Sequence, residues 1–213
     1  MASGLKMSSQ PLQLSGPSGQ LEGVLDAPSD MPTAGVAVIA HPHPLYGGAM
    51  SNKVVHTMAR ACVQSGWQAV RFNFRGVGGS AGTYDEGRGE LQDMLAVIEQ
   101  TAAADVPLIL AGFSFGSFVA SHAIAALHET RDIRHVVLVG TAASRFEVAP
   151  LPQDLHERSL VVHGEQDDTV PLASVMDWAR PQQLPVTVVP GGEHFFHGQL
   201  PLLKSLVERH LRA

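Results

Sequence analysis

The sequence predicts an α/β fold, in which helices cover both faces of a doubly wound, mostly parallel sheet, and three observations predict it. Short apolar runs rich in β-branched residues recur between Gly, Pro and His residues, as is typical of buried parallel strands. Segments of helical pattern separate these runs, and this alternation favours parallel pairing. Two earlier segments alternate apolar with other residues, which predicts antiparallel strands at the N-terminal edge of the sheet.

The predicted elements follow one another along the whole chain. Residues 12–14 and 21–25 form the antiparallel edge pair. The buried runs then predict six strands: 36–40 (VAVIA), 69–74 (AVRFNF), 108–111 (LILA), 136–139 (VVLV), 160–163 (LVVH) and 186–189 (VTVV). The segments between and after them predict helices at 52–64, 89–103, 115–127, 172–179 and 199–211. In sheets of this kind the active groups lie at the carboxyl ends of strands, so we expect functional motifs directly after them.

Length and composition narrow the class of protein. A chain of 213 residues suffices for one well-buried domain, so we expect a single domain over residues 1–213. The net charge is −6 and no two Lys or Arg residues are adjacent, which makes nucleic acid and anionic membranes poor candidate partners. Cys62 is the lone cysteine and has no partner for a disulfide within the chain. The first residues are polar and no apolar run is long enough to cross a bilayer, so we expect a cytoplasmic protein.

The clearest motif lies where the predicted strand 108–111 meets the helix 115–127. It reads Gly112-Phe113-Ser114-Phe115-Gly116, which is G-x-S-x-G between a strand and a helix. Such a turn exposes the serine hydroxyl in a strained backbone conformation, so Ser114 is the predicted nucleophile. The start of the following helix favours negative charge, and the Phe115 N–H is the predicted first oxyanion donor.

Two aspartates compete as the acid that orients a base. Asp167 and Asp168 both follow the predicted strand 160–163. A carboxylate there is positioned to reach a histidine on the next loop, and the other carboxylate is expected to be solvated or to cap the helix that starts near Pro171. Spacing alone does not separate the two.

Two histidines compete as the general base. His194 and His197 lie in the glycine-rich loop after the predicted strand 186–189, and either has the chemistry required. The chain order Ser…Asp…His, with each residue after a strand, is the order that a sheet of this kind demands. The sequence therefore predicts nucleophilic catalysis by a serine, which needs neither a metal nor an organic cofactor.

The loop after the strand 36–40 is expected to supply the second oxyanion N–H. Pro42 and Pro44 have no N–H, which leaves His43, Leu45 or Tyr46, and we expect Leu45. The sequence around His41 and His43 offers no third metal ligand, so a metal site is disfavoured. We expect these two histidines to stabilise the loop by hydrogen bonds. The later run Gly76-Val77-Gly78-Gly79 lacks the third glycine of a dinucleotide site and predicts a structural turn.

Five runs in order carry a resemblance to a known family. They are HPHPLYGGAMSNKVVHTMARAC (41–62), VRFNFRGVGGSAG (70–82), AGFSFGS (111–117), HGEQDDTVP (163–171) and GGEHFFHG (191–198). From about Val36 to the C-terminus, the chain resembles the small, capless bacterial α/β-hydrolases that are related to dienelactone hydrolase and described as predicted esterases.

The resemblance implies the α/β-hydrolase fold without a cap domain and a role for each candidate. It implies Ser114 as nucleophile, Asp167 rather than Asp168 as acid, and His194 rather than His197 as base. Dienelactone hydrolases themselves use a cysteine nucleophile, whereas this chain has Ser114 at the corresponding position. The segment 141–159, where lid-bearing relatives insert a cap, leaves room for a loop or one short helix, and Arg145, Phe146 and Leu151 are candidates for the pocket mouth.

These inferences predict a serine hydrolase that cleaves carboxylic esters of small acyl groups through an acyl-enzyme. A thioesterase with the same residues is an alternative, and a non-catalytic binding module on the same fold is another. A nucleotide-binding protein is disfavoured, because prolines stand where a phosphate loop needs N–H groups. The expected partner is a small-molecule ester or thioester, and the sparse charge, 16 % of residues, points to a homodimer surface.

Overall fold

The computed structural model describes residues 6–29 and 32–212, and within them a single mixed sheet of eight strands forms the centre. Its order is β1-β2-β4-β3-β5-β6-β7-β8. The strands are β1 (Met7–Gly16), β2 (Gly19–Pro28), β3 (Val36–Ala40), β4 (Gln68–Phe72), β5 (Leu108–Phe113), β6 (Ile133–Val139), β7 (Ser159–Gly164) and β8 (Thr187–Val189). β1 and β2 pair antiparallel, β2 meets β4 antiparallel, and all later pairs are parallel.

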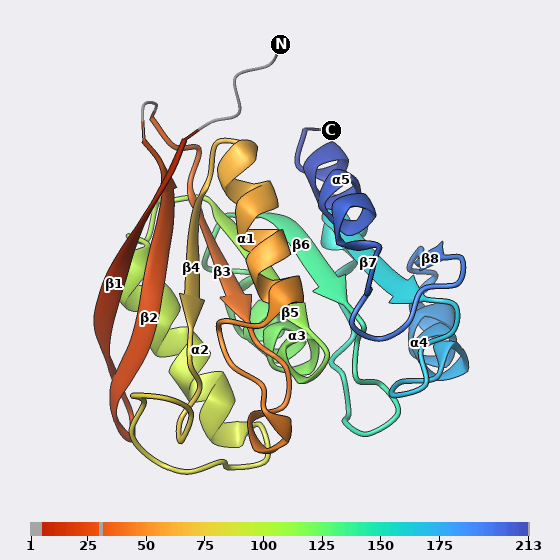
Figure 1. Ribbon diagram of the computed structural model, residues 1–213, viewed down its shortest axis with the longest axis horizontal. Helices are drawn as coiled ribbons and strands as arrows, with labels where there is room; N and C mark the ends of the chain where they lie inside the picture. Colours follow the sequence, from red (N-terminus) through yellow and green to blue (C-terminus); the bar gives the residue numbers. More distant parts are fainter. Residues whose placement is uncertain (1–5, 30–31, 213) are drawn as a thin grey trace.

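Helices cover both faces of this sheet. α1 (Lys53–Gln64) and α5 (Leu200–His210) lie side by side on one face and are in front of the sheet in Figure 1. α2 (Arg88–Thr101), α3 (Phe115–Leu127) and α4 (Leu172–Ala179) contribute to the core on the other face. Short 3₁₀ helices are η1 (Pro44–Tyr46), η2 (Gln153–Arg158) and η3 (Arg180–Gln182).

The central strands are buried on both faces, which explains their continuous apolar runs. In β5, Leu108 and Leu110 belong to the core shared with α2 and α3, whereas Ile109 and Ala111 belong to the core shared with α1 and α5. Successive side chains of a strand point to opposite faces, so a strand covered on both sides needs apolar residues at every position.

The predicted fold class is confirmed, with the antiparallel strands at the N-terminal edge. β1 and β2 extend beyond residues 12–14 and 21–25, because their hairpin pairing runs from Met7 opposite Pro28 to Gly16 opposite Gly19 and takes in polar residues on an exposed edge. The strand predicted to reach residue 74 ends at Phe72, and the Phe74 N–H donates instead to His41 Nε2.

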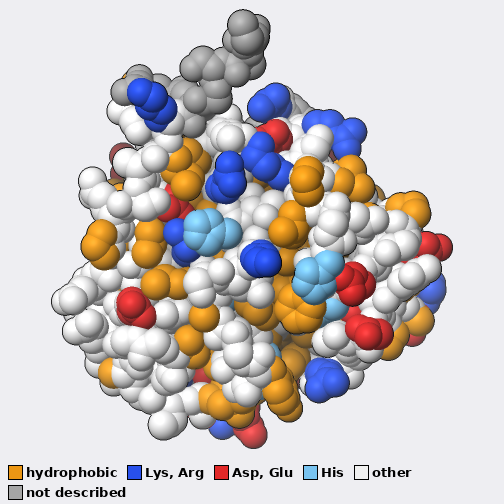
Figure 2. All heavy atoms as spheres, in the orientation of Figure 1, with side chains coloured by type: hydrophobic (Ala, Val, Ile, Leu, Met, Phe, Trp, Pro, Cys, Tyr) orange, Lys and Arg blue, Asp and Glu red, His pale blue; other side chains and the backbone are white. Residues whose placement is uncertain are grey.

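The segment after β6 carries no cap. Residues 141–158 form a loop and the 3₁₀ helix η2 before β7 begins at Ser159. In Figure 1 the arrowheads of β3 to β7 point toward the edge from which this loop projects. Figure 2 shows Lys and Arg side chains gathered near the C-terminal ends of α1 and α5, whereas the opposite edge carries a mixture of uncharged, hydrophobic and scattered charged groups. No helix among the described residues has the length and apolarity needed to span a membrane.

Candidate active site

Ser114 occupies the sharp turn between β5 and α3. Its backbone has φ 55° and ψ −116°, a conformation that non-glycine residues rarely adopt. A Cβ at position 112 would lie 2.2 Å from the Gly116 carbonyl oxygen, and one at 116 would lie 2.2 Å from that of Ala40. Both flanking glycines are therefore required by close backbone approach, and the turn presents the Ser114 side chain at the carboxyl edge of the sheet.

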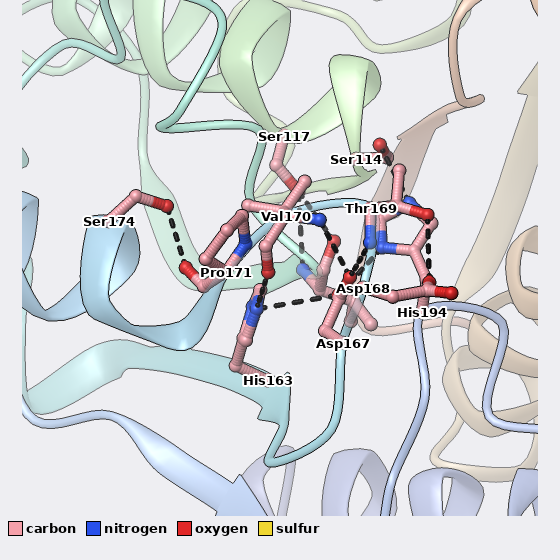
Figure 3. A network of polar contacts seen from close by, with 11 residues as sticks. Ser114, Ser117, His163, Asp167, Asp168, Thr169, Val170, Pro171, Ser174 and His194 are labelled. Carbon is pink, nitrogen blue, oxygen red and sulfur yellow. Dashed lines mark hydrogen bonds and ion pairs between the residues drawn. The ribbon is translucent and has the colours of Figure 1, made fainter.

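Ser114, His194 and Asp167 form one chain of hydrogen bonds (Figure 3). His194 Nδ1 lies 2.7 Å from Asp167 Oδ2, and His194 Nε2 lies 3.0 Å from Ser114 Oγ. Because a carboxylate only accepts, Nδ1 carries the proton and Nε2 accepts from the serine hydroxyl. All three residues are buried, with exposed fractions of 8 % for Ser114, 3 % for His194 and 6 % for Asp167.

Asp167 is fixed by its own loop. Its Oδ1 accepts hydrogen bonds from the N–H of Val170 at 2.7 Å and of Thr169 at 3.0 Å, which leaves Oδ2 for His194. Burial opposes ionisation of this carboxyl group, but the hydrogen bonds from His194 and Val170 outweigh it, so the pKa of Asp167 lies below its ordinary value. The carboxylate is therefore charged where it meets His194.

The two competing residues lie elsewhere. Asp168 is exposed and accepts a hydrogen bond from the neighbouring Thr169 hydroxyl. His197 is exposed and pairs with Glu193. Neither residue touches the hydrogen-bonded chain, so the structure brings Asp167 and His194 to Ser114 and leaves Asp168 and His197 outside.

The loop after β3 does not fit the expectation for Leu45 as an oxyanion donor. The Leu45 N–H donates to His43 Nδ1 at 3.2 Å, and the Tyr46 N–H donates to the His43 carbonyl oxygen at 3.1 Å. Leu45 is also 66 % exposed and does not line the pocket, whereas His43 does. With prolines at 42 and 44, the remaining candidate is the His43 N–H, for which the described residues provide no hydrogen-bond acceptor.

His41 braces this loop, as expected. It is fully buried; its Nδ1–H donates to the Pro42 carbonyl oxygen at 2.6 Å and its Nε2 accepts from the Phe74 N–H at 3.0 Å. Burial lowers the pKa of His41 to about 4, so the ring is neutral and can serve as both donor and acceptor. The ring thereby ties the loop after β3 to the chain after β4.

A pocket of about 290 Å³ opens at Ser114. Its lining residues are Pro42, His43, Tyr46, Gly47, Gly48, Asn52, Ser114, Phe115, Ala142, Arg145, Phe146, Thr169, Val170, His194 and Phe195. Most of the lining residues are apolar or aromatic. Among the described residues that line the pocket, Arg145 alone is a Lys, Arg, Asp or Glu. Burial, together with the nearby Arg145, lowers the pKa of His43.

The segment after β6 contributes two of its three expected residues to this pocket. Arg145 and Phe146 line it, whereas Leu151 is buried away from it. Sequence reasoning missed Asn52 and Val170 as lining residues, and it missed the contact of His163 with Asp167. For His163 a signal existed, since it precedes Asp167 by four residues at the end of a strand.

The arrangement is suited to nucleophilic chemistry. A serine hydroxyl hydrogen-bonded to a histidine, which is itself held by a carboxylate, is activated for attack on a carbonyl carbon. Among residues 6–29 and 32–212, no cluster of three or more His, Cys, Asp or Glu side chains is placed to hold a metal ion.

Comparison with known proteins gives a consistent result. Residues 34–202 match the family described as "Alpha/beta hydrolase domain". A serine hydrolase without a lid from Xanthomonas campestris is 34 % identical, with a TM-score of 0.82 over 96 % of this chain and 94 % of that one. A serine hydrolase homologue from Coxiella burnetii is 36 % identical, with a TM-score of 0.78 over 95 % and 97 %. The protein RP471 of Rickettsia prowazekii is 33 % identical over an alignment of 202 positions that covers 87 % of this chain and 81 % of that one.

Proposed function

The chain belongs to the α/β-hydrolase domain family, and from this premise we propose that it is a serine hydrolase that cleaves carboxylic esters of small acyl groups through an acyl-enzyme. One observation carries the proposal, namely the hydrogen-bonded chain Ser114 Oγ–His194 Nε2 and His194 Nδ1–Asp167 Oδ2. Similarity to a serine hydrolase from Xanthomonas campestris and to a serine hydrolase homologue from Coxiella burnetii, at 34 % and 36 % identity, supports it.

In the proposed acylation step, Ser114 Oγ attacks the ester carbonyl carbon while His194 Nε2 takes the hydroxyl proton. The carbonyl oxygen becomes an oxyanion, which the N–H groups of Phe115 and His43 stabilise. Phe115 begins α3, so the partial positive charge at this helix end adds to the effect. The ester bond then breaks, and His194 returns the proton to the leaving alcohol.

In the proposed deacylation step, His194 takes a proton from a water molecule that attacks the acyl-Ser114 carbonyl carbon. Collapse of the second oxyanion releases the acid and restores the serine hydroxyl. Asp167 acts in both steps, because its charged carboxylate holds the His194 tautomer and stabilises the imidazolium. The lowered pKa of Asp167 keeps this charge at neutral pH.

The pocket supports a small, largely apolar acyl or alcohol group. A volume of about 290 Å³ is at the lower end for ligand sites, and its walls are mainly apolar or aromatic. The short loop after β6 places no cap above the pocket. Substrates of the size of acetate and butyrate esters therefore suit it.

The test is hydrolysis of p-nitrophenyl acetate and p-nitrophenyl butyrate by the wild-type protein and by Ser114→Ala, with a fluorophosphonate label applied to both. We expect turnover and labelling in the wild type, and a loss of about 10⁴-fold or more in kcat with no labelling in Ser114→Ala. Circular dichroism and thermal unfolding serve as the control that the variant is folded.

The other outcomes are equally informative. A folded wild type that gives neither turnover nor label contradicts the proposal and favours a non-catalytic binding module. Labelling with faster turnover of an acyl thioester than of the matched oxygen ester places the activity among thioesterases, which use the same residues.

A further inference from the structure

A second histidine contacts the acid of the proposed mechanism and has no part in that mechanism. His163, the penultimate residue of β7, has an exposed fraction of 0 %. Its Nε2 lies 2.8 Å from the Val170 carbonyl oxygen and 3.4 Å from Asp167 Oδ2. Figure 3 shows His163 and His194 approaching Asp167 from β7 and from the loop after β8, respectively.

The neighbours of His163 determine its tautomer. A carbonyl oxygen and a carboxylate oxygen both only accept hydrogen bonds, so His163 Nε2 carries the proton. This N–H makes its shorter bond to Val170 and a longer electrostatic contact with Asp167 Oδ2. His163 Nδ1 is buried and has no hydrogen-bond partner among the described residues.

The unpartnered Nδ1 indicates that His163 is neutral in the folded protein. A second proton there would place an unsolvated charge in the interior, and burial accordingly lowers the pKa of His163 despite the opposing influence of Val170 and Asp167. His194 is the other titratable group that acts on it. A neutral donor supplies a dipole to Asp167 without competing with His194 for the carboxylate charge.

We propose that His163 is a positioning residue for the hydrolysis: its Nε2–H ties Asp167 Oδ2 to the Val170 carbonyl group and holds that oxygen toward His194. Both oxygens of Asp167 are then restrained, Oδ1 by the N–H groups of Thr169 and Val170 and Oδ2 by the two histidines. The inference rests on the proposed function, because positioning the acid matters only where His194 acts as base.

Removing this donor has two physical consequences. The carboxylate gains rotational freedom about its Cβ–Cγ bond, so its alignment with His194 is less well defined. It also loses a stabilising N–H, becomes more basic, and attracts the His194 proton more strongly. Both effects reach the chemical step through His194.

The decisive pair of variants is His163→Gln and His163→Asn. Glutamine carries its Nε2 the same number of bonds from Cβ as histidine does, so it can restore the donor, whereas asparagine places its amide one bond short. Val162→Ala is the matched control, because it removes buried atoms from the adjacent position of the same strand without touching Asp167. Steady-state rates with p-nitrophenyl butyrate are measured from pH 5 to pH 9 for all four proteins.

We expect His163→Asn to lower kcat about 5- to 30-fold with KM within about twofold, and to move the acid limb of the pH profile to higher pH. His163→Gln is expected to recover most of kcat. In proton NMR, the His194 Nδ1–H resonance is expected to shift in His163→Asn and to stay in place in Val162→Ala.

The proposal is overturned if glutamine and asparagine lower kcat equally, or if the pH profile and the His194 resonance do not respond to either. The NMR readout needs no turnover, so it separates failure of this inference from failure of the proposed function. If the wild type has no esterase activity but its His194 resonance still responds to His163→Asn, the proposed function is overturned and the positioning role of His163 is not.

Discussion

At the scale of single residues, the neighbouring carboxylates Asp167 and Asp168 have opposite environments. Asp167 is buried and accepts from two backbone N–H groups and from His194, whereas Asp168 is exposed. A side chain that holds a base must have its own orientation fixed, and only Asp167 has the contacts that do this. The difference arises from the direction in which each side chain leaves the turn after β7.

Substitution of these two residues tests that difference. We expect Asp167→Asn to lower kcat by about 10⁴-fold, because the amide favours the wrong His194 tautomer and cannot stabilise the imidazolium. Asp168→Asn, the same change one residue on, is expected to alter kcat less than about threefold. The measurement is kcat for p-nitrophenyl butyrate, and a larger loss in Asp168→Asn would show that the acid is misassigned.

At the scale of elements, the loop between β3 and α1 meets the turn between β5 and α3. The Ala40 carbonyl group approaches Gly116 so closely that no side chain fits there, and the pocket wall runs directly from His43 to Phe115. The two segments are far apart in the sequence, and the pairing of β3 with β5 brings them together. The expected oxyanion site is thus a property of two loops held by adjacent strands.

The His43 N–H can be removed with little change to the loop. The φ angle of His43 is −53°, close to the value that proline requires. We therefore expect His43→Pro to lose about 10²- to 10³-fold in kcat relative to His43→Ala, which loses the same ring but keeps the N–H. Stopped-flow or steady-state kcat values for the two variants decide the point, and equal activities would exclude this N–H as an oxyanion donor.

At the scale of the whole molecule, buried neutral histidines connect stability to pH. Burial lowers the pKa of His41 to about 4. Burial is also the largest cause that lowers the pKa of His135 to about 4. The unfolded chain binds these protons below about pH 6.5, whereas the folded chain does not. The contribution of these neutral rings to the free energy of unfolding is therefore fully present above pH 6.5 and is lost as the pH falls from 6.5 toward 4.

Thermal unfolding measured between pH 7.5 and pH 4.5 tests this linkage. For the fully buried His41, the free energy of unfolding is expected to fall by about 1.4 kcal/mol per pH unit below pH 6.5. His41→Gln is expected to be less stable at pH 7.5 but to show a shallower dependence of stability on pH. A wild-type Tm that is constant from pH 7 to pH 5 would contradict the linkage.

Local patterns along the chain are enough to predict the fold class and the order in which chemically active residues follow the strands. Buried strands need apolar residues on both faces, helices repeat every 3.6 residues, and a serine between two glycines marks one particular turn, so all three signals are local. Spacing leaves the two aspartates and the two histidines unresolved, and the family resemblance favours Asp167 and His194. The folded chain shows that these two residues contact each other and that His194 contacts Ser114, that the Leu45 N–H is already bonded to His43, and that His163 touches Asp167. These features depend on the directions of side chains within turns and on contacts between segments that are far apart in the chain. Neighbouring residues of the same type cannot be distinguished by a local pattern, because their roles differ only in the direction that the folded backbone gives to each side chain.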